Sequence, residues 1–218
     1  MTNPPPEPLS RITNDIIQRF ETMGAARDQA VTQGRQLVRL AANAIRSMHR
    51  DAVDQADSLL DDASALLMEL RTIAAPFPSV YWAGYVQDAM KEYAEAVLTS
   101  AMLRGEPLPG PRHIQVEDGA WLNGLAEAAS ELRRDTLDAL RANEIERALA
   151  LMDQMDNVYA MLVTIDFPDA VTGGLRRTTD QLRAVLERTR ADVTVAVRQQ
   201  RLERLLQATE DRWSGELP

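Results

Sequence analysis

The chain contains no cysteine, and its 218 residues include only two histidines, His49 and His113. Without cysteine there can be no disulfide, no thiolate zinc site and no cysteine nucleophile. No Glu-x-x-His pair is present, which argues against a ferritin-like di-iron bundle. The His-Glu-x-x-His, P-loop, Rossmann and Gly-x-Ser-x-Gly signatures are also missing. The sequence therefore offers no motif for the common zinc, nucleotide or serine-nucleophile chemistries.

Long apolar runs are missing as well. The longest uncharged stretch, residues 72–87, contains Pro76 and Pro78 and is too short to cross a bilayer. The first residues show neither the basic region nor the apolar core of a signal peptide. We therefore expect a soluble, cytoplasmic protein with no membrane partner.

Positive charge is scarce and unevenly placed. The net charge is −9, which argues against attraction of the whole molecule to nucleic acid, and Lys91 is the only lysine among 24 basic residues. Residues 35–50, however, contain no acid. On a helix their four arginines lie within about 60° of one another, with His49 at the edge. This arginine stripe consists of Arg35, Arg39, Arg46 and Arg50. It is either a solvated face or a phosphate-binding surface, since guanidinium groups match phosphate oxygens.

The apolar spacing is helical along most of the chain, and no strand-type alternation persists. We predict an all-α fold, a single-domain bundle of long antiparallel helices over residues 9–212. Residues 1–8 are expected to be a disordered lead, and residues 213–218 a flexible tail. Ser79 is expected to cap the third helix. The predicted helices span residues 9–50, 51–71, 80–103, 116–140, 144–164 and 175–212.

Two pairs of glutamates stand out on the predicted third and fourth helices. Glu92 and Glu95 are three residues apart, and Glu127 and Glu131 are four apart, so each pair shares one helical face. If the two helices face each other, four carboxylates meet with no cationic partner nearby. Such a group suits Mg²⁺ or Mn²⁺, which prefer carboxylate and water ligands. The alternative is that these glutamates form ordinary solvated helix surface.

Four stretches together resemble the translin family, and within it the branch of translin-associated factor X and its archaeal relatives. Residues 39–50 are similar to the basic segment of the family's first helix, and Phe77-Pro78 to the connection that precedes its third. Residues 92–96, Glu-Tyr-Ala-Glu-Ala, resemble the Glu-Tyr-x-Glu-Ala motif of the catalytic branch. Residues 118–134 resemble the signature of the fourth helix. The resemblance extends over about residues 20–205.

This resemblance implies an α-helical bundle that assembles into an octameric shell, with Mg²⁺-dependent endoribonuclease activity on RNA held inside. The implied catalytic and metal-binding residues are Glu92, Glu95, Glu127 and Glu131. The residues that we expect to bind RNA, from the arginine stripe and from the place of Arg134 one turn after Glu131, are Arg35, Arg39, Arg46, His49, Arg50 and Arg134. The chain departs from the catalytic branch at one ligand position, where Glu127 stands in place of the common aspartate.

Two other functions remain open at this stage. The first is a shell that binds RNA or single-stranded DNA without cleaving it, as in the translin branch, which lacks the paired glutamates. The second is a helical oligomer with no nucleic-acid partner, against which the acid-free arginine stripe argues. Because this chain carries both the stripe and the glutamates, we expect a homo-oligomer.

Overall fold

The structure, a computed structural model, describes residues 7–215, and within this range the chain forms eight helices and no strand. The predicted all-α class is therefore confirmed. None of the helices in this range combines the length and the apolar character that a membrane span needs. The helices are α1 (Glu7–Met48), α2 (Val53–Ala74), α3 (Pro78–Tyr81), α4 (Gly84–Arg104), α5 (Asp118–Arg141), α6 (Ile145–Leu162), α7 (Asp169–Thr172) and α8 (Leu175–Gly215).

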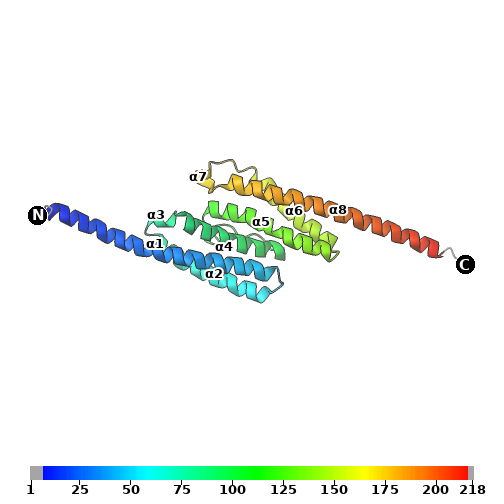
Figure 1. Cartoon of the computed structure of the whole chain (residues 1–218), viewed down its shortest axis with the longest axis horizontal. Coiled ribbons are helices and arrows are strands. Elements are labelled where there is room, and N and C mark those ends of the chain that lie inside the picture. Colours follow the sequence, from blue (N-terminus) through cyan, green and yellow to red (C-terminus); the bar gives the residue numbers. More distant parts are fainter. Residues whose placement is uncertain (1–6, 216–218) are drawn as a thin grey trace, which may run out of the picture. The chain divides into compact units, whose positions relative to one another are not determined.

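The chain divides into two compact units, one up to Tyr93 and the other from Ala94 onward. In the first unit α1 and α2 pack side by side as a helical hairpin (Figure 1). The turn between them contains Asp51 in the left-handed conformation, with φ 56°. Leu37 of α1 and Leu67 and Leu70 of α2 are at most 1% exposed. The periodic leucines predicted to form apolar faces thus supply the core of this hairpin.

A glycine brings the start of α4 close to α1. A Cβ atom at Gly34 would lie only 3.2 Å from the carbonyl oxygen of Tyr85, in the first turn of α4. A side chain at this position would require the backbone of Tyr85 to shift by a few tenths of an ångström, so glycine suits the close approach of the two helices. The helix α1 continues unbroken through Gly34 and Gly24.

In the second unit α5, α6 and α8 pack against one another, with α7 beside α5 and α8. Figure 1 shows α6 and α8 running along α5. Leu132, Met155 and Leu182, one from each long helix, are completely buried. Nη2 of Arg190 on α8 donates to both carboxylate oxygens of Asp156 on α6, at 2.6 and 2.9 Å. These hydrogen bonds are the main reason that the pKa of Arg190 is raised above its ordinary value.

Asn123, which is 4% exposed, joins α5 to α7 and α8. Its Nδ2 atom donates to the carbonyl oxygens of Gly119, at 2.8 Å, and of Thr172, at 2.7 Å. Its Oδ1 atom accepts a hydrogen bond from the hydroxyl of Thr178 at 2.6 Å. A buried amide with all these partners fixes the short helix α7 in place, since an unpaired polar group would be costly there.

Two local predictions were wrong. The predicted third helix is two helices, because Pro78 begins the short helix α3 and a turn at residues 82–83 separates it from α4. Ser79 lies inside α3 and caps nothing, and its hydroxyl instead contacts the sulfur of Met23 at 3.3 Å. The helix α7 was missed because four residues are too few to show a period.

Other helix ends lie within about three residues of the predicted ones, which is the usual uncertainty of helix termini. The domain limits at residues 8 and 213 stay predictions, and residues 1–6 and 216–218 of the predicted lead and tail lie outside the described range.

Candidate metal site

The site begins with two glutamates on one face of α4. This helix runs without interruption from Gly84 to Arg104, across the division between the two units, so helical geometry alone fixes how Glu92 and Glu95 are related. Glu95 is buried, with 9% of its surface exposed, and the side chain of Glu92 is 30% exposed. A carboxylate as buried as Glu95 is costly to desolvate and needs a compensating partner.

A third glutamate, Glu127 of α5, joins this pair. One carboxylate oxygen from each of Glu92, Glu95 and Glu127 lies within 4.8 Å of the others. Oxygens that share one Mg²⁺ at its usual ligand distance are separated by at most about 4.2 Å, so small side-chain rotations would complete the coordination. Three carboxylates at this spacing fit a hard divalent cation. We refer to these three residues as the glutamate trio.

Small residues flank Glu95 and Glu127. Ala94 and Ala96 surround the first, Ala126 and Ala128 surround the second, and all four alanines are completely buried. Helices with small residues at their contact can approach more closely than helices with large ones. The alanines in both motifs thus explain how two glutamate side chains from different helices can meet.

The expectation that the carboxylates have no nearby cation was wrong. The ammonium Nζ of Lys91 lies 3.0 Å from Oε1 of Glu92, and the lysine side chain is only 21% exposed. Lys91 also precedes Glu95 by four residues, so the two side chains share a helical face. The signal that could have predicted this contact was the uniqueness of Lys91 beside the Glu-Tyr-Ala-Glu-Ala motif.

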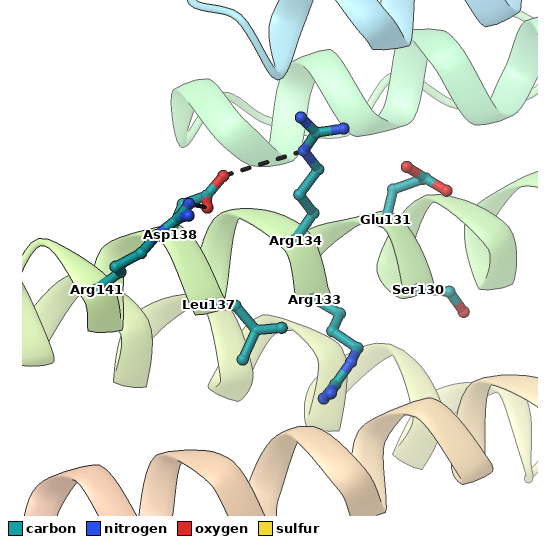
Figure 2. A pocket seen from close by; sticks show the side chains of 7 residues that line it. All are labelled: Ser130, Glu131, Arg133, Arg134, Leu137, Asp138 and Arg141. Atoms are coloured by element: carbon teal, nitrogen blue, oxygen red, sulfur yellow. Dashed lines mark hydrogen bonds and ion pairs between the residues drawn. The ribbon is translucent and has the colours of Figure 1, made fainter.

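Glu131, the fourth predicted ligand, lies one turn beyond Glu127 on α5. It lines a hollow of about 590 Å³, which is open to solvent and is formed by residues of α5 between Ser130 and Arg141. In Figure 2, Glu131 and Arg134 point to one side of α5, whereas Arg133 and Leu137 point to the other, toward α8. The described structure therefore places Glu131 with Arg134 rather than in the glutamate trio.

The three arginines of this hollow have different surroundings. Arg133 donates to Asp192 at 2.9 Å and to Thr189 at 3.0 Å, both on α8, so it ties two helices together. Arg141 is paired with Asp138. Arg134 lies 4.0 Å from Asp138, and its side chain is 59% exposed. Arg134, which the sequence predicts to bind RNA, is thus exposed and points to the same side of α5 as Glu131.

The arginine stripe lies in the first unit, and all four of its arginines are exposed, while His49 is half-buried. Arg35, Arg39 and Arg46 lie on α1, but this helix ends at Met48, so Arg50 lies in the turn before α2 and not on the predicted helical face. Arg46 donates a hydrogen bond to Asn43 in the preceding turn. On the opposite face Leu37, Ala41 and Met48 are buried, as predicted. The stripe is a row of guanidinium groups that solvent, or phosphates, can reach.

Tyr93 lies between the two glutamates of α4 in sequence but points into the core of the first unit, where it is 5% exposed. Burial is the main reason that the pKa of its phenol is raised above the ordinary value of 10.0. A hydrogen bond with Ser64 opposes this shift, and the negative charge of Asp61 adds to it. Both partners lie on α2, so one face of α4 is anchored in the core while the neighbouring face carries glutamates.

Comparisons with known proteins begin with a negative result, since no established family profile matches the chain. An uncharacterized protein of Methanocaldococcus jannaschii is 25% identical over 191 residues, which cover 87% of this chain and 84% of that protein. That relative has no assigned activity.

Three solved structures are similar over most of the chain, and they come from archaeal and fungal C3PO. AfC3PO in a complex with duplex RNA has 29% sequence identity and a TM-score of 0.79, and the match covers 84% of this chain and 95% of that one. The crystal structure of AfC3PO has 29% sequence identity and a TM-score of 0.78, and the match covers 84% of this chain and 96% of that one. Apo-NeC3PO, at 17% identity and a TM-score of 0.78, covers 89% and 100% and is similar in fold. These likenesses and the order of the helices show that the chain has the translin-family fold, as its motifs predicted.

Proposed function

We propose that the chain is a Mg²⁺- or Mn²⁺-dependent endoribonuclease, which binds short or single-stranded RNA and cleaves its phosphodiester backbone. The observation that carries this proposal is the glutamate trio, which brings three ligand oxygens within 4.8 Å of one another on α4 and α5. The RNA complex of AfC3PO, which has the same fold at 29% identity, supports RNA as the substrate class.

Each member of the trio would contribute one oxygen to the ion, and Mg²⁺ would keep further positions for water and phosphate. A divalent ion at this place would supply positive charge beside the phosphate and would activate a water molecule. Glu92 and Glu95 hold their oxygens through the rigid helix α4, and the burial of Glu95 limits how far it can move. Glu127 reaches the same point from α5, with a longer side chain than the aspartate of the catalytic branch.

Glu131 and Arg134 would act next to the trio. Both are on the same side of α5, and Glu131 is one turn from Glu127 (Figure 2). We assign Glu131 the role of a further ligand or of the group that orients the attacking water. Arg134, with its exposed guanidinium, would hold a phosphate oxygen of the RNA.

The arginine stripe would bind the RNA backbone. Its guanidinium groups are exposed, three on one face of α1 and that of Arg50 in the turn after it, so they can follow a row of phosphates. Such contacts carry no sequence information, which fits a protein that accepts many short RNAs or single-stranded DNA.

We also propose a homo-oligomer, with an octameric shell as the expected assembly. The last part of α8 supports it, because Leu202, Leu206 and Trp213 are 57%, 55% and 74% exposed. Their spacing of four and seven residues places them on one face, and an apolar row of this length is unfavourable in water. Light scattering that shows a stable monomer at micromolar concentration would contradict this part of the proposal.

The test is a cleavage assay on a labelled single-stranded RNA oligonucleotide, with Mg²⁺, Mn²⁺, Ca²⁺ or EDTA. We expect cleavage with Mg²⁺ and Mn²⁺, and no cleavage in EDTA. In Ca²⁺ the RNA should bind but be cleaved poorly, because the coordination of Ca²⁺ is looser. Binding without cleavage under every condition would favour the shell that only binds RNA or single-stranded DNA. Absence of binding would leave the helical oligomer as the better account.

A further inference from the structure

Lys91 is the single lysine of the chain, and the other 23 of its 24 lysine and arginine residues are arginines. It is also placed unusually, with Nζ 3.0 Å from Oε1 of Glu92, a member of the glutamate trio. Its side chain is 21% exposed, which leaves the ammonium partly accessible to a ligand. A surface lysine could be replaced by arginine at little cost, so the retained lysine calls for a reason in the chemistry of this position.

Arginine and lysine differ in what they would do to Glu92. The planar guanidinium of arginine can bind both oxygens of a carboxylate at once, which would compete strongly with a cation for the same group. The compact ammonium of lysine contacts one oxygen and leaves the other free. The flexible stem also lets the ammonium turn from the carboxylate toward a neighbouring anion.

We propose that Lys91 is a catalytic residue whose ammonium contacts the scissile phosphate beside the glutamate trio, and which pairs with Glu92 when RNA is absent. This inference rests on the proposed endoribonuclease function and adds a residue to it. The positive charge of Lys91 serves two purposes. It offsets the mutual repulsion of the glutamates in the free protein, and it offers the phosphate a donor on the α4 side.

Removing Lys91 should raise the affinity for Mn²⁺ and lower the kcat of RNA cleavage. Lys91→Met takes away a positive charge that repels a divalent cation and a partner that occupies Glu92, so Mn²⁺ should bind more tightly. The same change removes a phosphate contact, so kcat at saturating Mn²⁺ should fall. If Lys91 only kept Glu92 in position, its loss would instead weaken Mn²⁺ binding.

The experiment measures Mn²⁺ affinity of the full chain without RNA, by calorimetric titration, and then RNA cleavage at saturating Mn²⁺. For Lys91→Met we expect Mn²⁺ to bind roughly threefold to tenfold more tightly, from charge removal alone. We expect kcat to fall by about a hundredfold, as for the loss of one strong donor to a developing charge. Circular dichroism and light scattering confirm that each variant is folded and assembled.

Two further variants sharpen the result. Lys91→Arg keeps the charge, so it should retain more activity than Lys91→Met, but its fork should bind Glu92 and weaken Mn²⁺ binding relative to wild type. Arg147→Met is the matched control, because it removes an arginine of α6 that pairs with Glu144, the residue before this helix, at 3.2 Å, and should change neither quantity.

The outcomes separate the inference from the function on which it rests. Wild-type protein that binds Mn²⁺ and cleaves RNA, together with a Lys91→Met variant that binds Mn²⁺ more weakly or keeps its kcat, overturns the role of Lys91 alone. Wild-type protein that neither binds Mn²⁺ nor cleaves RNA overturns both.

Discussion

The arginine stripe, on α1 and the turn after it, and the glutamate trio of α4 and α5 are two charged regions in opposite environments. The arginines are exposed, and each can adopt many conformations without disturbing the fold. The trio contains a glutamate that is 9% exposed, and three carboxylates whose oxygens lie within 4.8 Å of one another. Like charges at that distance repel each other, more strongly where water is partly excluded.

The difference shows how much each region says about function. A solvated row of arginines costs the protein little, so its existence alone is compatible with having no role. A half-buried group of like charges costs stability, and such costs are found mainly at functional sites. The trio is therefore the stronger indication of chemistry, and the role proposed for the stripe depends more on experiment.

The largest expected effect comes from neutralising the trio. Glu95→Gln and Glu127→Gln each remove a ligand charge with almost no change of shape, so each should reduce RNA cleavage by several orders of magnitude. RNA affinity and assembly should remain, as measured by gel shift and light scattering. Glu146→Gln, the same chemical change at an exposed site on α6, is the control. If both trio variants cleave like wild type, the trio is merely a surface feature of the helices.

The next effect tests the stripe. Changing Arg39, Arg46 and Arg50 together to glutamate should abolish RNA binding while the helical circular dichroism signal stays intact. In the control, Arg11, Arg19 and Arg27 are changed to glutamate. These are three exposed arginines of α1, and the change in net charge is the same. Equal losses in the two variants would show that only net charge matters and that the stripe is not the binding surface.

Salt dependence gives a finer measure of the same contacts. A variant with Arg39, Arg46 and Arg50 changed to glutamine should retain weak binding. Its slope of log K against log salt should be shallower by about 2 than that of wild type, if each arginine contacts one phosphate of a single strand. The measurement is fluorescence anisotropy of labelled RNA at several salt concentrations. An unchanged slope would move the phosphate contacts to other residues.

A smaller effect concerns stability without metal. Arg39→Gln should change the free energy of unfolding by less than about 0.5 kcal/mol, as is usual for an exposed side chain. Glu95→Gln should leave the metal-free protein at least as stable as wild type, because it relieves repulsion within the trio. Urea unfolding in EDTA measures both. A loss above about 2 kcal/mol for Glu95→Gln would indicate that its charge stabilises the fold.

The smallest effect concerns the buried side of α4. Because the pKa of Tyr93 is raised above 10.0 in the folded protein, the phenol ionises first in the unfolded chain. Its contribution to stability is complete below about pH 10 and is lost as the pH rises toward the folded pKa. Tyr93→Phe should reduce this alkaline loss in thermal melts from pH 8 to 11, and Tyr159→Phe on α6 serves as control. An identical alkaline loss in the Tyr93 variant would contradict the assignment.

The meeting of Glu127 with Glu92 and Glu95 depends on tertiary packing, whereas the long helices and the glutamate pair of α4 could be predicted because they depend on local periodicity. Glu92 and Glu95, for example, share a face through helical geometry alone. Prediction from the sequence failed at Ser79, where a proline one residue earlier begins a separate turn, and at α7, which is held by the Asn123 hydrogen bonds rather than by its own period. It also missed the contact of Lys91 with Glu92, because adjacent residues on a helix do not normally face each other.

The uniqueness of Lys91 also determines how the chain can be cut. A protease specific for lysine has one cleavage site here, after residue 91, only two residues before the division between the compact units. In the folded protein that bond lies within a continuous helix, next to a side chain that is 21% exposed, and should resist attack. Cleavage would require α4 to open locally, so the rate at which two fragments appear would report the free energy of that opening.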